Sequence, residues 1–111
     1  MQTIVISMDS RKMENPDLDI RYLLPDRIEA WSEGAVADNG YDYVDEEGHI
    51  LAVWLETGDA EAWWPKILEL LKTEQFCDND LSKSALVLVS EEETAELAQC
   101  RQVWPEPRTS D

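Results

Sequence analysis

The middle of this 111-residue chain contains no basic residue. No lysine or arginine lies between Arg27 and Lys66, and the whole sequence carries 25 acidic against 9 basic residues, a formal net charge of −16. A surface of this sign repels nucleic-acid phosphates and anionic membranes, so the composition argues against direct binding to either. The partners that such a chain attracts are cations and basic proteins.

Other features are scarce, and each absence removes a class of function. No apolar run approaches the roughly 18 residues that a membrane span requires. The start of the sequence, MQTIVISMDSRK, has no basic leader followed by a long apolar segment. We therefore expect a cytoplasmic protein that contacts no membrane. The four glycines form no glycine-rich phosphate loop, so nucleotide binding has no local support.

Metal-binding motifs are absent as well. Cys77 and Cys100 lie far apart without CxxC or metal-ligand spacing, and the sequence leaves a disulfide between them open. The Asp-Asn-Asp at 78–80 resembles the start of a calcium loop, but Lys83 stands where that loop needs glycine and Val89 where it needs glutamate. We expect no metal and no cofactor.

A catalytic constellation is also missing. His49 is the only histidine, and no serine or cysteine lies in a nucleophile-elbow or thiol-protease motif. Carboxylate pairs such as Asp17 and Asp19 exist, but a domain of this size leaves little room for a carbohydrate-sized cleft between two acids. We therefore predict that the protein is not an enzyme. A small carboxylate-based metal-binding or enzyme domain is the alternative from that class.

Apolar runs predict the strands. TIVISM at 3–8 and SALVLV at 84–89 are β-branched and apolar, as buried strands are. Residues 41–45 and 49–55 flank a short connection and predict a hairpin, while Asn39-Gly40 before it indicates a turn.

Helical spacing and capping residues predict three helices. The first begins at Pro25 and ends near Glu33, where Gly34 follows. The second begins after Asp59, which is placed as an N-cap, and carries apolar residues at helical spacing. The third runs over 91–101, after a Ser-x-x-Glu capping box that starts at Ser90.

The order of these elements predicts one α+β domain over residues 1–104. We expect a four-stranded, mainly antiparallel sheet with two or three helices on one face, in the ferredoxin-like order of split βαβ units. The apolar strands 50–55 and 85–89 would be central. Residues 105–111 are expected to form a flexible tail, and the free protein is expected to be a monomer.

Aromatic residues accompany the acidic run. Five tryptophans occur in the chain, and Trp63 and Trp64 are adjacent in the second predicted helix. Because consecutive helical residues point about 100° apart, both cannot face the centre of the core. An aromatic side chain at the rim among charged neighbours resembles the anchor of a protein interface, although packing at the rim of the core is the simpler explanation.

The acidic run therefore predicts a protein-binding face. We expect the hairpin and the start of the second helix to lie close together, because only three residues separate Leu55 from Asp59, so that their charges form one field. The residues predicted to contact a basic partner are Asp42, Asp45, Glu46, Glu47, Glu56, Asp59, Glu61 and Trp63.

The chain resembles a type of bacterial protein in its length, acidity, tryptophan content and element order. The stretch YDYVDEEGHILAVWLETGDAEAWWPKILELLK carries the resemblance, which is to the immunity proteins of contact-dependent inhibition and other polymorphic toxin systems. It implies a cognate toxin domain, often a nuclease, that is neutralised by tight binding in the cytoplasm. Phage-encoded inhibitors of nucleic-acid-binding defence proteins are acidic in the same way and remain the alternative.

Overall fold

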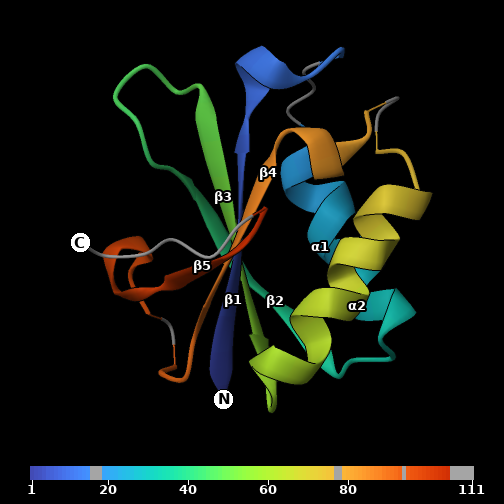
Figure 1. Ribbon diagram of the computed structural model, residues 1–111, viewed down its shortest axis with the longest axis vertical. Helices are drawn as coiled ribbons and strands as arrows, with labels where there is room; N and C mark the ends of the chain where they lie inside the picture. Colours follow the sequence, from blue (N-terminus) through green and yellow to red (C-terminus); the bar gives the residue numbers. More distant parts are fainter. Residues whose placement is uncertain (16–18, 77–78, 94, 106–111) are drawn as a thin grey trace.

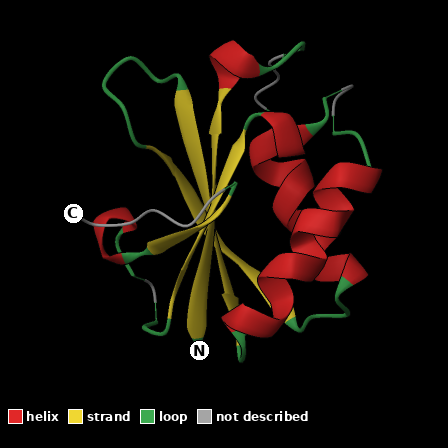
Figure 2. Ribbon diagram, in the orientation of Figure 1, coloured by secondary structure: helices red, strands yellow, loops and turns green. Residues whose placement is uncertain are grey.

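A computed structural model of the chain describes residues 1–15, 19–76, 79–93 and 95–105. Within these residues a five-stranded antiparallel sheet carries two α-helices on one of its faces (Figures 1 and 2). The helices are α1 (Ile20–Trp31) and α2 (Ala60–Thr73). The strands are β1 (Gln2–Asp9), β2 (Val36–Tyr43), β3 (Ile50–Thr57), β4 (Ala85–Ser90) and β5 (Arg101–Trp104). Their order in the sheet is β2-β3-β1-β4-β5.

The α+β class is confirmed, and so are the apolar strands. β3 and β4 are interior strands with β1 between them. On β1, Ile4, Ile6 and Met8 belong to the core under the helices, whereas Val5 and Ser7 alternate with them and are buried on the other face. A strand that is covered on both faces does not alternate between polar and apolar residues, which explains its continuous apolar sequence.

The predicted number of four strands is wrong, because the segment 91–101 does not form a helix. It contains a turn, a 3₁₀ helix η3 (Leu97–Gln99) and the start of β5. The Ser90 hydroxyl accepts a hydrogen bond from Glu92 N (3.1 Å) and so closes a turn. The Thr3 hydroxyl donates to Glu92 O (2.8 Å) and holds the chain against the sheet. The local turn at Ser90 and the long-range bond from Thr3 together take the place of the helix that the capping pattern favours.

The start of the first helix is also corrected. α1 begins at Ile20 and continues through Pro25. Ile20, Leu24 and Ile28 recur at helical spacing and are fully buried. Burial of such side chains stabilises the fold by roughly 1.5–3 kcal/mol each, whereas a proline inside a helix costs about 3 kcal/mol. The apolar stripe therefore decides where the helix begins.

The hairpin is present, but its strands extend further than predicted. Asn39-Gly40 lies inside β2, at a register shift between Asp38 and Tyr41, and does not form a separate turn. Gly40 has a φ of 99°, which glycine adopts without steric strain and which allows the strand to bulge. Residues 44–49 connect β2 to β3. Apart from Pro105, the predicted tail at 105–111 lies outside the described residues.

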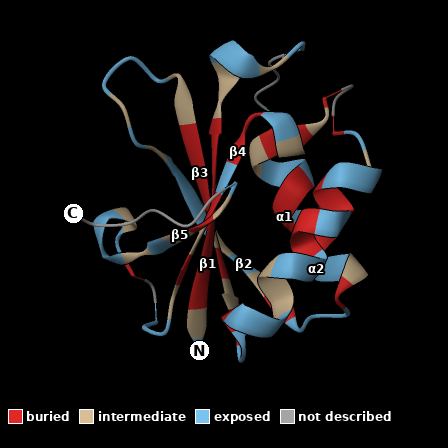
Figure 3. Cartoon of the chain, in the orientation of Figure 1, coloured by how far each residue is buried: buried red, intermediate tan, exposed pale blue. Residues whose placement is uncertain are grey.

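The two faces of the sheet are covered differently (Figure 3). The main core lies between the sheet and the helices, with Leu51, Val53 and Leu55 contributed by β3. The opposite face, called here the open face, carries the alternate residues. Its central row has Val5 between Trp54 and Leu88, and the next row has Ser7 between Ala52 and Leu86. The connection between β4 and β5 and the connection between β2 and β3 both lie on this side (Figure 1).

Candidate partner-binding surfaces

The structure separates the predicted partner-binding residues into two groups. Asp45, Glu46 and Glu47 lie in the β2–β3 connection, before β3 begins, whereas Asp59 and Glu61 follow its other end. β3 has eight residues, so these groups lie about 23 Å apart along the strand at about 3.3 Å per residue. The expectation that the two groups adjoin is wrong. The short link after Leu55 joins α2 to the end of β3 that lies opposite the β2–β3 connection.

Asp42 and Glu56 lie between the two groups, on the open face. Asp42 is opposite Ala52 on β3, and Glu56 is opposite Thr3 on β1. Asp42 is exposed and its Oδ1 accepts a hydrogen bond from Tyr43 N (2.8 Å). Neither carboxylate forms an ion pair with the described residues. Both therefore contribute negative potential to the open face. None of the described strand residues that point to this face is basic.

Asp45 organises the β2–β3 connection. Its carboxylate accepts hydrogen bonds from Ile50 N (2.8 Å) and His49 N (3.1 Å). The Ile50 N–H, followed by the His49 N–H, holds the pKa of Asp45 below its ordinary value, against the opposing effect of burial. Glu47 lies 3.1 Å from His49 Nδ1 and is mostly exposed, as is Glu46. Asp45 thus has a structural role, while Glu46 and Glu47 face solvent.

Asp59 and Glu61 also have local contacts. Asp59 Oδ1 accepts from Ala62 N (3.2 Å), which confirms the predicted N-cap of α2. Glu61 pairs with Arg101 on β5 and accepts a hydrogen bond from Trp64 Nε1 (3.2 Å). Their charges are therefore partly used in holding the start of α2 and its contact with β5.

Trp63 lies at the rim of the core. Its ring is 5.7 Å from that of Trp31 on α1 in an edge-to-face arrangement, and Lys66 Nζ lies 4.7 Å from its centroid. Both Trp63 and Trp64 are half-buried. The contact with Trp31 joins the two helices, which leaves only part of the Trp63 ring available to a partner.

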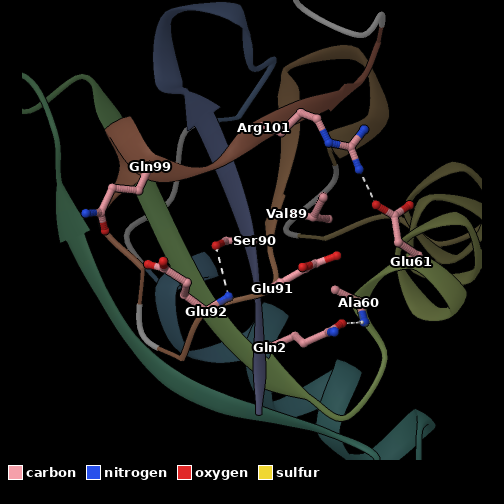
Figure 4. Close-up of a pocket in the computed structure, with 9 residues that line it drawn as sticks. All are labelled: Gln2, Ala60, Glu61, Val89, Ser90, Glu91, Glu92, Gln99 and Arg101. Atoms are coloured by element: carbon pink, nitrogen blue, oxygen red, sulfur yellow. Dashed lines mark hydrogen bonds and ion pairs between the residues drawn. The ribbon is translucent and has the colours of Figure 1, made fainter.

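A cavity lies beside the start of α2. It has a volume of about 380 Å³ and is bordered by the ends of β1 and β4, the start of α2 and the β4–β5 connection. Figure 4 shows Arg101 reaching toward Glu61, with Glu91 and Glu92 on the adjoining turn. Gln2 Oε1 accepts a hydrogen bond from Ala60 N (2.7 Å) and fixes the floor. The lining contains neither histidine nor cysteine, and its carboxylates favour positively charged groups.

Most described basic side chains are held by neighbours in the same molecule. The ion pairs are Arg11–Asp9, Arg27–Glu74 and Arg101–Glu61, and the contacts with aromatic rings are Arg21–Tyr22, Lys66–Trp63 and Lys72–Trp104. Lys12 and Lys83 line a second cavity of about 230 Å³ together with Glu14 and Asp80. Arg11 is also close enough to Asp45 and Glu47 for their charges, after the contact with Asp9, to raise its pKa, and Arg21 lies over Tyr41 on β2, so the acids of β2 and its connection are offset only in part.

Sequence reasoning missed an exposed aromatic cluster on α1 and β2. Tyr22 and Leu23 are 49% and 48% exposed, and Tyr41 is 41% exposed. A signal for the two α1 residues exists, because a helix beginning at Ile20 places both outside the buried stripe of Ile20, Leu24 and Ile28. A helix that begins at Pro25 leaves Tyr22 and Leu23 outside it and hides this signal.

No group of three or more His, Cys, Asp or Glu residues suited to a metal ion occurs in the described parts of the chain. Among these same residues, no helix is long and apolar enough to cross a membrane. Comparison with known proteins finds no match to a protein-family model, to a curated protein or to a solved structure.

Proposed function

We propose that this protein is a small acidic inhibitor that binds a basic protein and neutralises it. In this proposal it acts as a monomer in the cytoplasm, and its partner is a cognate toxin domain, as for immunity proteins. The observation that carries the proposal is the segregation of charge. Asp42, Glu46 and Glu56 form no ion pair among the described residues, while five basic side chains are held by residues outside β2 and the β2–β3 connection, and Arg21 lies over Tyr22 and Tyr41.

A one-signed surface of this kind acts on the encounter with a partner. Complementary potentials raise association rates by about 10–10³-fold, and like-charged molecules are turned away. Arg27 and Arg101 are engaged with Glu74 and Glu61, so neither is paired with the acids of β2 or of the connection that follows it. Half-buried Trp54 and exposed Leu86 on the open face supply apolar area beside the acids.

A nuclease is the partner class that this chemistry favours. Proteins that bind nucleic acid present clefts rich in Lys and Arg, because they must neutralise phosphates. Carboxylates that occupy such a cleft exclude the phosphates without imitating a substrate in detail. A phage-type inhibitor of a nucleic-acid-binding defence protein would use the same contacts, so the identity of the partner distinguishes the two cases.

The test is neutralisation of the product of the neighbouring gene. The chain is co-expressed with that product, and growth is compared with and without the chain. We expect rescue of growth, and a purified complex whose association rate falls about tenfold or more between about 20 and about 150 mM salt. Restored phage plating without growth rescue would identify a defence protein as the partner. Absence of a complex with any basic product of the locus would overturn the proposal.

A further inference from the structure

Tyr22 and Tyr41 form an exposed aromatic pair at the outer edge of the molecule. Tyr22 projects from α1 and Tyr41 from the edge strand β2, with ring centroids 5.8 Å apart and ring planes at 90°. The guanidinium of Arg21 lies 4.7 Å from the centroid of Tyr22 and 5.6 Å from that of Tyr41. We call Arg21, Tyr22, Leu23 and Tyr41 the tyrosine edge.

The two rings are fixed in place although they are exposed. The contact with the Tyr41 hydroxyl, followed by the charge of Arg21, lowers the pKa of Tyr22, and the same hydroxyl contact raises the pKa of Tyr41. The edge-to-face packing of the two rings and the guanidinium over both of them are the contacts that hold the pair together. Rings that pack against each other and against a guanidinium lose less conformational entropy when a partner binds than free side chains do, which suits a binding anchor.

Acidic side chains surround the tyrosine edge. Asp19 and Asp26 lie one helical turn before and after Tyr22, and both are exposed. Further along the two elements, Glu29 Oε1 accepts a hydrogen bond from Asp38 N (3.1 Å), which places two more exposed carboxylates between α1 and β2. Arg27, on the same helix, is turned toward Glu74. Arg21 is thus the only described basic residue whose contacts lie within this surface.

We propose that the tyrosine edge is the docking surface for the basic partner, and that it receives arginine or lysine side chains. Arginine and lysine are attracted both to aromatic faces and to carboxylates, and this surface offers the two together. Arg21 already shows a guanidinium placed over these rings. Tyrosine is enriched at the energetic centres of protein interfaces, and Leu23 adds exposed apolar area.

Charge excludes two other occupants. Bases of single-stranded nucleic acid stack on tyrosine, but its phosphates would meet Asp19, Asp26 and Asp38. A second copy of the chain would bring the same acids against them. The inference rests on the proposed function and adds to it the place of contact and the chemistry of the partner's side chains.

The experiment uses an eight-arginine peptide as the probe at about 150 mM salt, where long-range attraction is screened. Binding to the isotope-labelled protein is followed by the amide and tyrosine-ring signals in NMR spectra. We expect the largest shifts at Tyr22, Leu23 and Tyr41. The double variant Tyr22→Ser/Tyr41→Ser should bind the peptide roughly tenfold or more weakly, whereas Tyr22→Phe/Tyr41→Phe, which keeps both rings, should stay within about threefold.

Two charge variants complete the design. Asp19→Asn/Asp26→Asn changes the same surface without touching a ring and should weaken binding, whereas Glu91→Gln/Glu92→Gln/Glu93→Gln removes more charge at a distant turn and should not. Largest shifts at Glu46, Glu47 or the 91–93 turn, with the serine variant binding normally, would overturn the tyrosine edge and leave the proposed function standing. Shifts at Tyr22, Leu23 and Tyr41 on addition of an oligothymidine probe would show that the tyrosine edge binds single-stranded nucleic acid, and would overturn the proposal of a basic partner at this surface. If the peptide bound neither the wild-type protein nor any variant, both the proposed function and the tyrosine edge as docking surface would be contradicted.

Discussion

The indole N–H of Trp54 donates a 2.8 Å hydrogen bond to the backbone carbonyl of Ala95, 41 residues further along the chain. Thr3, beside it on β1, donates to Glu92 O and accepts from Ala95 N. Two side chains of the open face thereby hold the β4–β5 connection across the sheet. Replacement of either should loosen that connection before it affects the helices.

Trp54→Phe keeps most of the ring and removes the donor. Because Ala95 O would lose its partner in a nearly buried position, we expect a loss of about 1 kcal/mol in the free energy of unfolding, measured by urea denaturation. Trp104→Phe is the matched control, since Trp104 Nε1 is buried without a hydrogen-bond partner among the described residues. An equal loss in both variants would show that the indole ring, and not the hydrogen bond to Ala95, is responsible.

The N-cap of α2 gives a second prediction. Asp59→Ala removes the acceptor for Ala62 N and should lower the free energy of unfolding by about 1 kcal/mol. Asp59→Ser keeps an acceptor at the cap and should lower the free energy of unfolding much less. Thermal and urea unfolding of both variants measure the difference. If serine and alanine are equally destabilising, the carboxylate acts through its charge at the helix start and not as a cap.

The fold was predictable where the pattern is local and strong. Ile4, Val5 and Ile6 are apolar in succession because both faces of β1 are covered. β5 has only four residues, and its pairing depends on the contacts of Thr3 and Trp54 with residues some 40 to 90 positions away. A Ser-x-x-Glu pattern followed by helix-forming residues could not reveal those contacts, so a helix was predicted there.

Acid unfolding should depend on Asp9. Arg11 donates to both carboxylate oxygens, through Nε (3.0 Å) and Nη2 (2.9 Å), and holds the pKa of Asp9 at about 2, below its ordinary 3.8. A lowered pKa in the folded state means that ionised Asp9 favours folding. This contribution is complete above about pH 4 and is lost as the pH falls toward about 2.

The measurement compares wild-type protein with Asp9→Asn by urea unfolding between about pH 2 and pH 6. We expect the wild type to be the more stable at pH 6 and the difference to vanish near pH 2. The comparison between the two proteins cancels the change in overall charge repulsion, which both share. A difference that stays constant with pH would assign the effect to packing of the side chain.

The sequence predicts the negative charge of the candidate surface but not which residues lie on it together. The absence of bases between Arg27 and Lys66 is visible in the sequence, and the structure leaves Asp42 and Glu56 without ion pairs among the described residues. Which acids share a surface depends on the path of the hairpin, and it separates Glu46 from Asp59. The pairing of Tyr22 with Tyr41 depends on how α1 packs against the edge of the sheet, which no local pattern contains.

Charge reversal in the β2–β3 connection separates steering from docking. Glu46→Lys/Glu47→Lys changes two exposed acids and leaves Asp45, which holds the connection through Ile50 N and His49 N. This pair is not part of the tyrosine edge, so reversal should slow association with the partner by about three- to tenfold at low salt and hardly change dissociation. Asp19→Asn/Asp26→Asn, which removes two acids that flank the tyrosine edge, should instead speed dissociation. Stopped-flow association and surface-plasmon dissociation with the basic partner measure the two effects.

If Glu46→Lys/Glu47→Lys speeds dissociation and the Asp19/Asp26 variant does not, the partner binds the β2–β3 connection, and the exposed tyrosines lie outside the interface.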